Sequence, residues 1–153
     1  MGNKSLQYHY DLYDGQLKEF LKELVEFIKD NIDVTLTYPE SYINFNLPLD
    51  KNSTKKQGKK FMWIDERNKN YKNINLRMFN IDYEKEQFEE LKNISNDKVE
   101  LSNGEEQNLF YSDVKIKEPV ELNEDFKKFI KRKYEEYKRF YNEDVDIRYK
   151  YNK

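Results

Sequence analysis

The chain has 153 residues, of which 38% are charged and 16% aromatic, with a formal net charge of −2, no cysteine and a single histidine, His9. This composition excludes a disulfide scaffold, a thiolate nucleophile, a cysteine metal site and a pair of catalytic histidines. It gives no basis for a wholly basic nucleic-acid binder, and no apolar run approaches the roughly 20 residues that span a bilayer. Disordered chains are poor in aromatics, so we expect one folded domain over residues 1–153, located in the cytoplasm, with no cofactor and no membrane contact. The abundance of Asn, Lys, Ile and Tyr suggests an AT-rich bacterial or phage genome.

The first predicted element is a helix over residues 14–31. Its apolar residues recur at i, i+3, i+4, i+7, i+8 and i+11, which is one face of a 3.6-residue period: Leu17, Phe20, Leu21, Leu24, Val25 and Ile28. Asp14 is the expected N-cap, because a short acidic side chain can accept a hydrogen bond from the first helical turn.

Strands are predicted across residues 32–79. The apolar period falls to two after the helix, and residues 32–38 and 42–47 are expected to form a hairpin that turns at Pro39. Residues 61–64 and 74–79 are two further predicted strands, separated by a polar turn.

The middle of the chain leaves an alternative open. A short helix is predicted over residues 84–93, and residues 97–117 hold a hairpin signal, since Asn-Gly at 103–104 is the strongest two-residue hairpin dipeptide. The alternative is that residues 97–108 form a mobile excursion.

A second long helix is predicted over residues 123–142, capped by Asn123 and with two acidic residues in its first turn. Its inner face is marked by Phe126, Phe129, Ile130, Tyr134, Tyr137, Phe140 and Tyr141. Residues 143–153 alternate again and form either a terminal edge strand or a tail. The order of elements predicts an α+β fold: an antiparallel sheet of about five to six strands, with both long helices packed on one face.

Several segments carry a resemblance to a known family: residues 41–45, 60–64, 73–77 and 114–116, followed by Leu122 and the helix from Phe126. Over residues 17–141 the chain resembles a small uncharacterised bacterial domain. That domain is found alone or at the C-terminus of restriction-type proteins with a ParB-like nuclease domain, and it is sometimes called a predicted transport protein. The resemblance implies an accessory module associated with nucleic-acid defence, and it implies no catalytic residue.

Asp113 and Lys115 are the sharpest enzymatic candidate. An acidic-x-Lys triplet on a strand, with a second carboxylate from Glu100 or Asp97 across the hairpin, would hold Mg²⁺ and position an attacking water near phosphate. The same triplet also begins at Glu90, Asp125 and Glu136. The alternative is therefore a solvated strand with no site, and we assign no metal.

Residues 51–60 hold the one concentrated basic patch, with lysines at Lys51, Lys55, Lys56, Lys59 and Lys60. Lys69, Tyr71, Lys72 and Arg77 are expected nearby, and Trp63 follows. Basic groups can neutralise phosphates while aromatic rings stack on bases, so this patch is a candidate nucleic-acid site. The alternative is a solvated loop tip.

The tyrosines suggest contact surfaces. Tyr137, Tyr141, Tyr149 and Tyr151 extend beyond what one sheet needs as cover, and they predict a partner or self-association surface. The alternative is that they pack on the first helix. His9 is expected to be a surface or packing residue, because no serine elbow accompanies it. The tyrosines beside it, Tyr8, Tyr10 and Tyr13, are expected to pack over the sheet or to form a contact patch.

Three observations favour a non-enzymatic, macromolecule-binding accessory or regulatory protein: the scarcity of residues for catalysis, with no cysteine and one histidine, the tyrosines, and the family resemblance. Its expected partner is a protein in bacterial or phage nucleic-acid defence. Two alternatives stay open: a divalent-metal-dependent nuclease that uses Asp113, Lys115 and Glu100, and a nucleic-acid-binding module that uses the lysines of residues 51–60.

Overall fold

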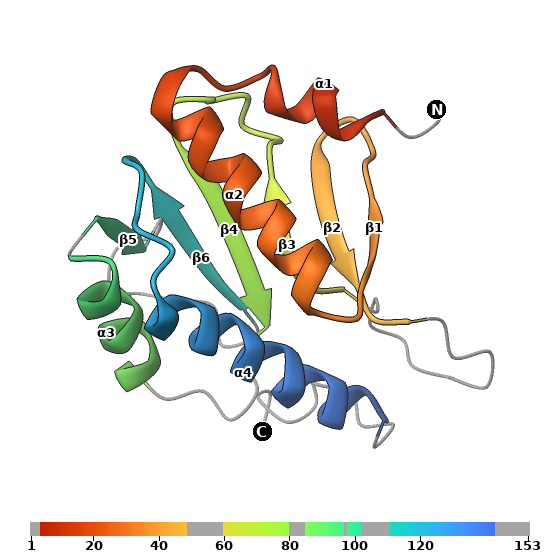
Figure 1. Cartoon of the computed structure of the whole chain (residues 1–153), viewed down its shortest axis with the longest axis vertical. Coiled ribbons are helices and arrows are strands. Elements are labelled where there is room, and N and C mark those ends of the chain that lie inside the picture. Colours follow the sequence, from red (N-terminus) through yellow and green to blue (C-terminus); the bar gives the residue numbers. More distant parts are fainter. Residues whose placement is uncertain (1–3, 49–59, 80–84, 97, 102–110, 143–153) are drawn as a thin grey trace.

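In the described part of the chain, six strands form one antiparallel sheet, with the long helices on one side of it (Figure 1). The computed structural model describes residues 4–48, 60–79, 85–96, 98–101 and 111–142. In chain order the elements are α1 (Leu6–Tyr10), α2 (Gly15–Asn31), β1 (Thr35–Thr37), β2 (Tyr42–Asn46), β3 (Lys60–Asp65), β4 (Ile74–Phe79), α3 (Lys85–Ile94), β5 (Val99–Leu101), β6 (Tyr111–Ile116) and α4 (Glu124–Asn142). The predicted α+β fold with an antiparallel sheet is confirmed.

The strands lie in the order β1-β2-β3-β4-β6-β5, and each neighbouring pair is antiparallel. One row of partnered residues crosses the sheet from Ile43 through Ile64 and Leu76 to Val114, and all four are buried. Because side chains alternate along a strand, this row fixes the core face of the sheet and leaves the neighbouring residues on the opposite face.

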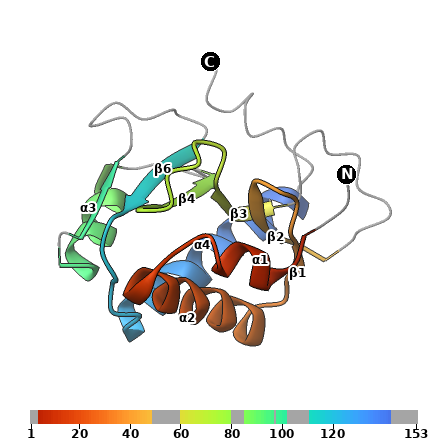
Figure 2. The ribbon, with the colours of Figure 1, turned by 90° about the horizontal axis from the view of Figure 1, so that it is seen from above.

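Both long helices lie on the core side of the sheet, and α4 crosses it obliquely (Figure 2). The predicted apolar stripe of α2 is buried throughout, at Leu17, Phe20, Leu21, Leu24, Val25 and Ile28. On α4, the ring of Tyr134 lies edge-on against Phe61 of β3 at 5.3 Å, and its hydroxyl donates to the carbonyl of Asp33 at 2.9 Å. These contacts join α4 both to the sheet and to the segment that follows α2.

The helix ends agree with the predicted caps in one case and differ in the other. The Asn123 Oδ1 atom accepts a hydrogen bond from the Phe126 amide at 2.8 Å, as expected of an N-cap. Asp14 occupies the N-cap position of α2, but its side chain makes no capping hydrogen bond. Gly15 follows it with a φ of 58°, a left-handed conformation that glycine adopts without steric cost.

α1 is not among the elements predicted from the sequence. Its N-cap is Ser5, whose hydroxyl accepts a hydrogen bond from the Tyr8 amide at 3.0 Å. β5 and β6 pair antiparallel, with Val99 opposite Ile116 and Leu101 opposite Val114. The Asn-Gly dipeptide at 103–104, predicted as a hairpin turn, and residues 143–153, predicted as an edge strand or a tail, lie outside the described residues.

Tyr10 gives a prediction about stability. Its side chain is buried and its hydroxyl has no hydrogen-bond partner among the described residues, so Tyr10→Phe should leave the free energy of unfolding at pH 7 unchanged or raise it by up to about 1 kcal/mol. Burial first, and then the charges of Glu26 and Tyr38, raise the pKa of Tyr10. Above the usual tyrosine pKa of about 10, the unfolded chain therefore releases this proton while the folded chain keeps it, and stability falls as pH rises. Tyr10→Phe should make that alkaline loss shallower in urea unfolding at pH 7 to 11.

Tyr13→Phe is the matched control for this substitution. Tyr13 is equally buried, but its hydroxyl donates to a Glu66 carboxylate oxygen at 3.1 Å. Removing a hydrogen bond to a buried carboxylate should cost about 1.5–3 kcal/mol at pH 7. Equal losses in the two phenylalanine variants would contradict the assignment of an unpartnered hydroxyl to Tyr10.

Candidate functional site

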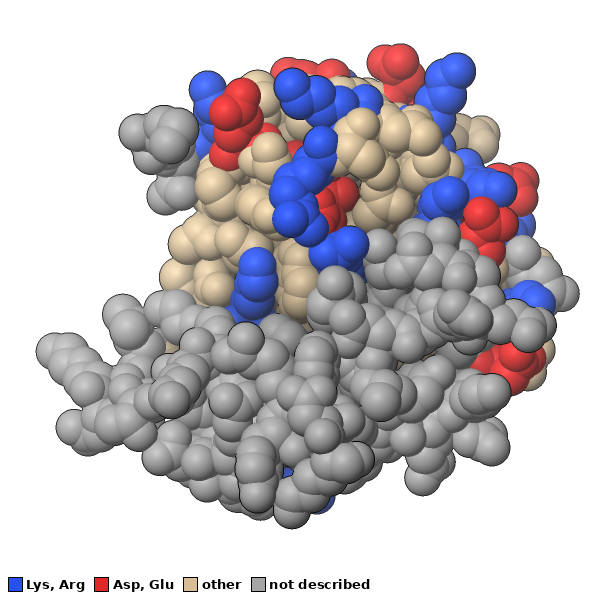
Figure 3. Space-filling view, turned by 180° about the vertical axis from the view of Figure 1, so that it is seen from behind, with Lys and Arg blue, Asp and Glu red and all other residues tan. Residues whose placement is uncertain are grey.

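The face of the sheet that points away from the core, here called the outer face, is covered by none of the described helices (Figure 2). One partnered row on this face runs from Thr37 through Asn44 and Trp63 to Arg77. Seen from behind, lysine and arginine side chains gather over the middle of its described part, with an acidic side chain beside them (Figure 3). The outer face is therefore polar, aromatic and basic, in contrast to the apolar core face.

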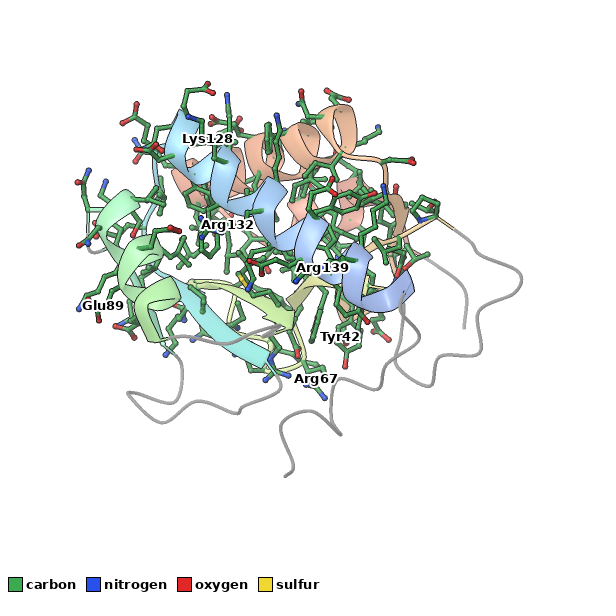
Figure 4. The ribbon with its side chains drawn as sticks, turned by 90° about the horizontal axis from the view of Figure 1, so that it is seen from below. Tyr42, Arg67, Glu89, Lys128, Arg132 and Arg139 are labelled. Atoms are coloured by element: carbon green, nitrogen blue, oxygen red, sulfur yellow. The ribbon has the colours of Figure 1, made fainter. Side chains whose placement is uncertain are left out.

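Aromatic rings and cations are interleaved at the junction of β2 and β3. The Lys60 ammonium lies 4.5 Å from the ring centroid of Trp63 and 5.0 Å from that of Tyr42. The Arg67 guanidinium lies 5.5 Å from the Tyr42 ring, and Figure 4 shows these two side chains close together. Each cation is near the electron-rich face of a ring, where it is electrostatically favoured.

Asp65, at the end of β3, holds two arginines at the same place. Arg67 donates to both of its carboxylate oxygens, with Nε at 3.1 Å from each and Nη2 at 2.7 Å from Oδ2. Arg77 Nη1 lies 3.2 Å from Oδ2. Burial disfavours the charged carboxylate, but the Arg67 hydrogen bonds and both guanidinium charges outweigh it and hold the pKa of Asp65 below its usual value.

We name Tyr42, Lys60, Trp63, Asp65, Arg67 and Arg77 the basic–aromatic cluster. Its three cations outnumber its one carboxylate, so the cluster carries an excess of positive charge. Burial is the main cause that lowers the pKa of Lys60; Asp65 opposes the shift, and the two arginines add to it. An anion bound here would favour the charged lysine and offset that repulsion.

The candidate nuclease residues lie farther across the outer face. The Cα partner of Asp113 is Arg77, while that of Glu100 is Lys115. The Glu100 carboxylate lies 3.7 Å from the Lys115 ammonium and 2.9 Å from that of Lys117, so its partners are lysines. Within the described part of the chain, no three acidic or histidine side chains gather as a metal site. The Asp113 side chain is outside the described structure, and its catalytic role stays a prediction.

The predicted binding residues are only partly brought together. Lys60 and Arg77 belong to the basic–aromatic cluster, whereas Tyr71 packs edge-on against Tyr13 at 5.7 Å. Tyr137 is only 2% exposed and belongs to the core, so it does not contribute to an exposed surface. The remaining predicted binding residues, Lys55, Lys56, Lys59, Tyr141, Tyr149 and Tyr151, lie outside the described side chains.

A buried polar network lies directly behind the cluster. The His9 Nδ1 atom lies 2.6 Å from Oε1 of Glu66, and the Tyr13 hydroxyl donates to Oε2 at 3.1 Å. We assign the proton to Nδ1, because an ionised carboxylate can only accept. Glu66 stands between Asp65 and Arg67 in the chain, so this network anchors α1 to the segment that carries the cluster. His9 is a packing residue, which was one of the two roles expected of it.

The helical side of the molecule has a shallow hollow of about 520 Å³ between α3 and α4. Glu89 lies on one side of it and Lys128 and Arg132 on the other (Figure 4). Arg132 is already paired with Glu90 across the hollow. Because the charges here largely neutralise one another, the hollow selects a ligand less clearly than the basic–aromatic cluster does.

Sequence reasoning missed Tyr42, Asp65 and Arg67. A signal for Tyr42 was present, because placing Ile43 and Phe45 on the core face puts Tyr42 on the other one. Asp65 and Arg67 were assigned to a polar turn, and only the register of β3 with β4 brings them to Arg77.

Comparisons with protein-family models, with curated proteins and with solved structures gave no match for this chain. The resemblance inferred from the sequence therefore stays a prediction. No helix in the described part of the chain is long and apolar enough to cross a membrane.

Proposed function

We propose that this protein is a non-enzymatic binding module that holds single-stranded nucleic acid on the outer face of its sheet. The observation that carries the proposal is the basic–aromatic cluster, where Lys60 and Arg67 flank the ring of Tyr42 on a face that no described helix covers. Open antiparallel sheets that present aromatic and basic side chains are a recurrent platform for unpaired bases.

The chemistry of the cluster divides into two tasks. Lys60 and Arg67 would contact phosphate oxygens, and the half-buried ring of Tyr42 would stack on a base. Trp63 is only 5% exposed beneath Lys60, so it supports the lysine and is not itself a stacking platform. A single strand fits this arrangement better than a duplex does, because duplex bases have their faces covered by stacking.

Several observations favour nucleic acid over the protein partner expected from the tyrosines. Tyr10, Tyr13 and Tyr137 are buried in the core, so they offer no contact patch. In the cluster, by contrast, the Arg67 side chain is 56% exposed and Lys60 is half-buried. An accessory role in bacterial or phage nucleic-acid defence remains part of the proposal, since single strands arise there.

The proposal is tested by titrating labelled single- and double-stranded DNA and RNA of equal length with the protein, in magnesium. Trp63 is the one tryptophan of the chain and lies in the cluster, so its fluorescence reports locally while anisotropy reports the complex. We expect single strands to bind with a Trp63 signal. The logarithm of the affinity should fall with the logarithm of salt with a slope of about 1.4, if Lys60 and Arg67 each neutralise one phosphate.

Three outcomes would contradict this function. Shortened strands would indicate a nuclease, and Asp113→Ala would then test the acidic-x-Lys site. Binding without any change in Trp63 fluorescence would place the contact elsewhere. If the protein binds none of the four nucleic acids, the result would favour a protein partner instead.

A further inference from the structure

The two arginines held by Asp65 differ in their access to solvent. The Asp65 side chain is 7% exposed and that of Arg77 is 19% exposed, whereas that of Arg67 is 56% exposed. Arg67 nevertheless provides most of the hydrogen bonds to the carboxylate, through its backbone amide at 3.0 Å as well as its guanidinium. The most exposed member of the group is thus the one that a ligand can reach.

The charges around Asp65 allow the Arg67 guanidinium to move away from its carboxylate. A buried carboxylate without a partner would be strongly unfavourable, which normally fixes a lone ion pair in place. Here Arg77 remains 3.2 Å from Oδ2, and the backbone amide of Arg67 continues to donate to Oδ1 when only the guanidinium swings away. Asp65 therefore keeps one cation and one hydrogen bond after its exposed arginine is withdrawn.

The geometry of the guanidinium defines the ligand that could take it. Its Nε atom donates to Oδ1 and its Nη2 atom to Oδ2 of the Asp65 carboxylate, and the same fork fits two non-bridging oxygens of a phosphate. The Arg67 guanidinium also lies beside the Tyr42 ring, so a phosphate bound there would place its nucleoside close to that ring.

We propose that Asp65 is an internal competitor for Arg67, and that a backbone phosphodiester of the bound strand displaces it while Arg77 stays on the carboxylate. This inference rests on the proposed function and adds a mechanism to it. In the free protein, Arg67 is paired with Asp65. Only a ligand with a bidentate anionic group displaces this carboxylate and gains the binding energy that Arg67 can provide.

The test measures the affinity of wild-type protein and variants for a labelled oligothymidylate by anisotropy. Asp65→Asn should bind about fivefold more tightly, because it removes an ion pair that competes with the ligand for the exposed Arg67. Ion pairs with an exposed partner are worth up to about that factor. Asp11→Asn is the control: Asp11 pairs with Lys18 at 3.0 Å on the helical side, and the substitution changes net charge equally. It should leave the affinity within about twofold of wild type.

Two more variants separate competition from a general gain of positive charge. If Asp65 acts through Arg67, the gain from Asp65→Asn should vanish in an Arg67→Ala background, as a double-mutant cycle reveals. Arg67→Lys keeps the charge but loses the fork, and it should weaken binding severalfold with the salt slope unchanged.

The inference is overturned if wild type binds the strand and either Arg67→Lys or Arg67→Ala binds equally well. It is also overturned if Asp65→Asn gains affinity equally with and without Arg67. Should Asp65→Asn fail to fold, the two Arg67 variants alone decide. A wild-type protein that binds no strand would instead count against the proposed function, so the two failures are distinct.

Discussion

Glu66→Ala should lower the free energy of unfolding by about 3–5 kcal/mol, which is a large fraction of the stability of a small domain. The substitution leaves the imidazole of His9 and the hydroxyl of Tyr13 buried without their common acceptor. His9 is 0% exposed, so water cannot replace the lost carboxylate unless the structure opens. Urea unfolding followed by circular dichroism measures the loss.

Two controls frame this prediction. Glu23→Ala, on the exposed side of α2, should change stability by no more than about 0.5 kcal/mol. Glu66→Gln retains an acceptor for one partner and should fall between Glu66→Ala and wild type. A loss below about 1 kcal/mol in Glu66→Ala would mean that the network contributes little and that α1 is held mainly by its apolar contacts.

Tyr42→Ala should weaken the binding of single strands by about 5- to 150-fold, since stacking of one base on an aromatic ring is worth about 1–3 kcal/mol. The salt slope should stay close to that of wild type, because Lys60 and Arg67 are retained. The measurement is the same anisotropy titration at several salt concentrations.

Phe27→Ala is the matched control for Tyr42→Ala. Phe27 is a half-buried aromatic on α2 that is likewise flanked by two cations, Lys127 at 5.5 Å and Lys131 at 5.8 Å from its ring centroid. It lies on the helical side, so its loss should not change the affinity. The reverse result, with Phe27→Ala weakened and Tyr42→Ala unchanged, would move the binding site from the sheet to the helices.

Elements with a clear apolar period could be predicted from the sequence, and their contacts could not. Alternation along residues 42–47 and the stripe of α2 gave the buried faces correctly, because burial itself imposes those periods. The place of β6 beside β4 has no such local signal, since α3 and β5 intervene in the chain. That pairing brings position 113 beside Arg77 rather than beside Glu100.

The burial of certain charged residues could likewise not be predicted from the sequence. Lys133 is 3% exposed on the inner side of α4, between predicted core residues, although lysines are usually found outside. Its burial lowers the pKa of the ammonium, and Glu136, 3.3 Å away, opposes that shift. Glu66 likewise finds its partner 57 residues earlier in the chain. Only the packed fold brings Glu66 to His9, whereas the i,i+3 spacing on α4 indicates the pairing of Lys133 with Glu136 but not its burial.

The shortness of the two edge strands has a consequence for how copies of this protein behave together. Within the residues that the structure describes, β1 and β5 each span three residues and offer few unpaired backbone groups to which another chain could add a strand. The outer face resists stacking of sheet on sheet, because its arginines and lysines would meet those of a second copy. In a chain with so many aromatic residues, these two features protect against aggregation. The charges that we propose attract a nucleic acid therefore also keep the molecules apart.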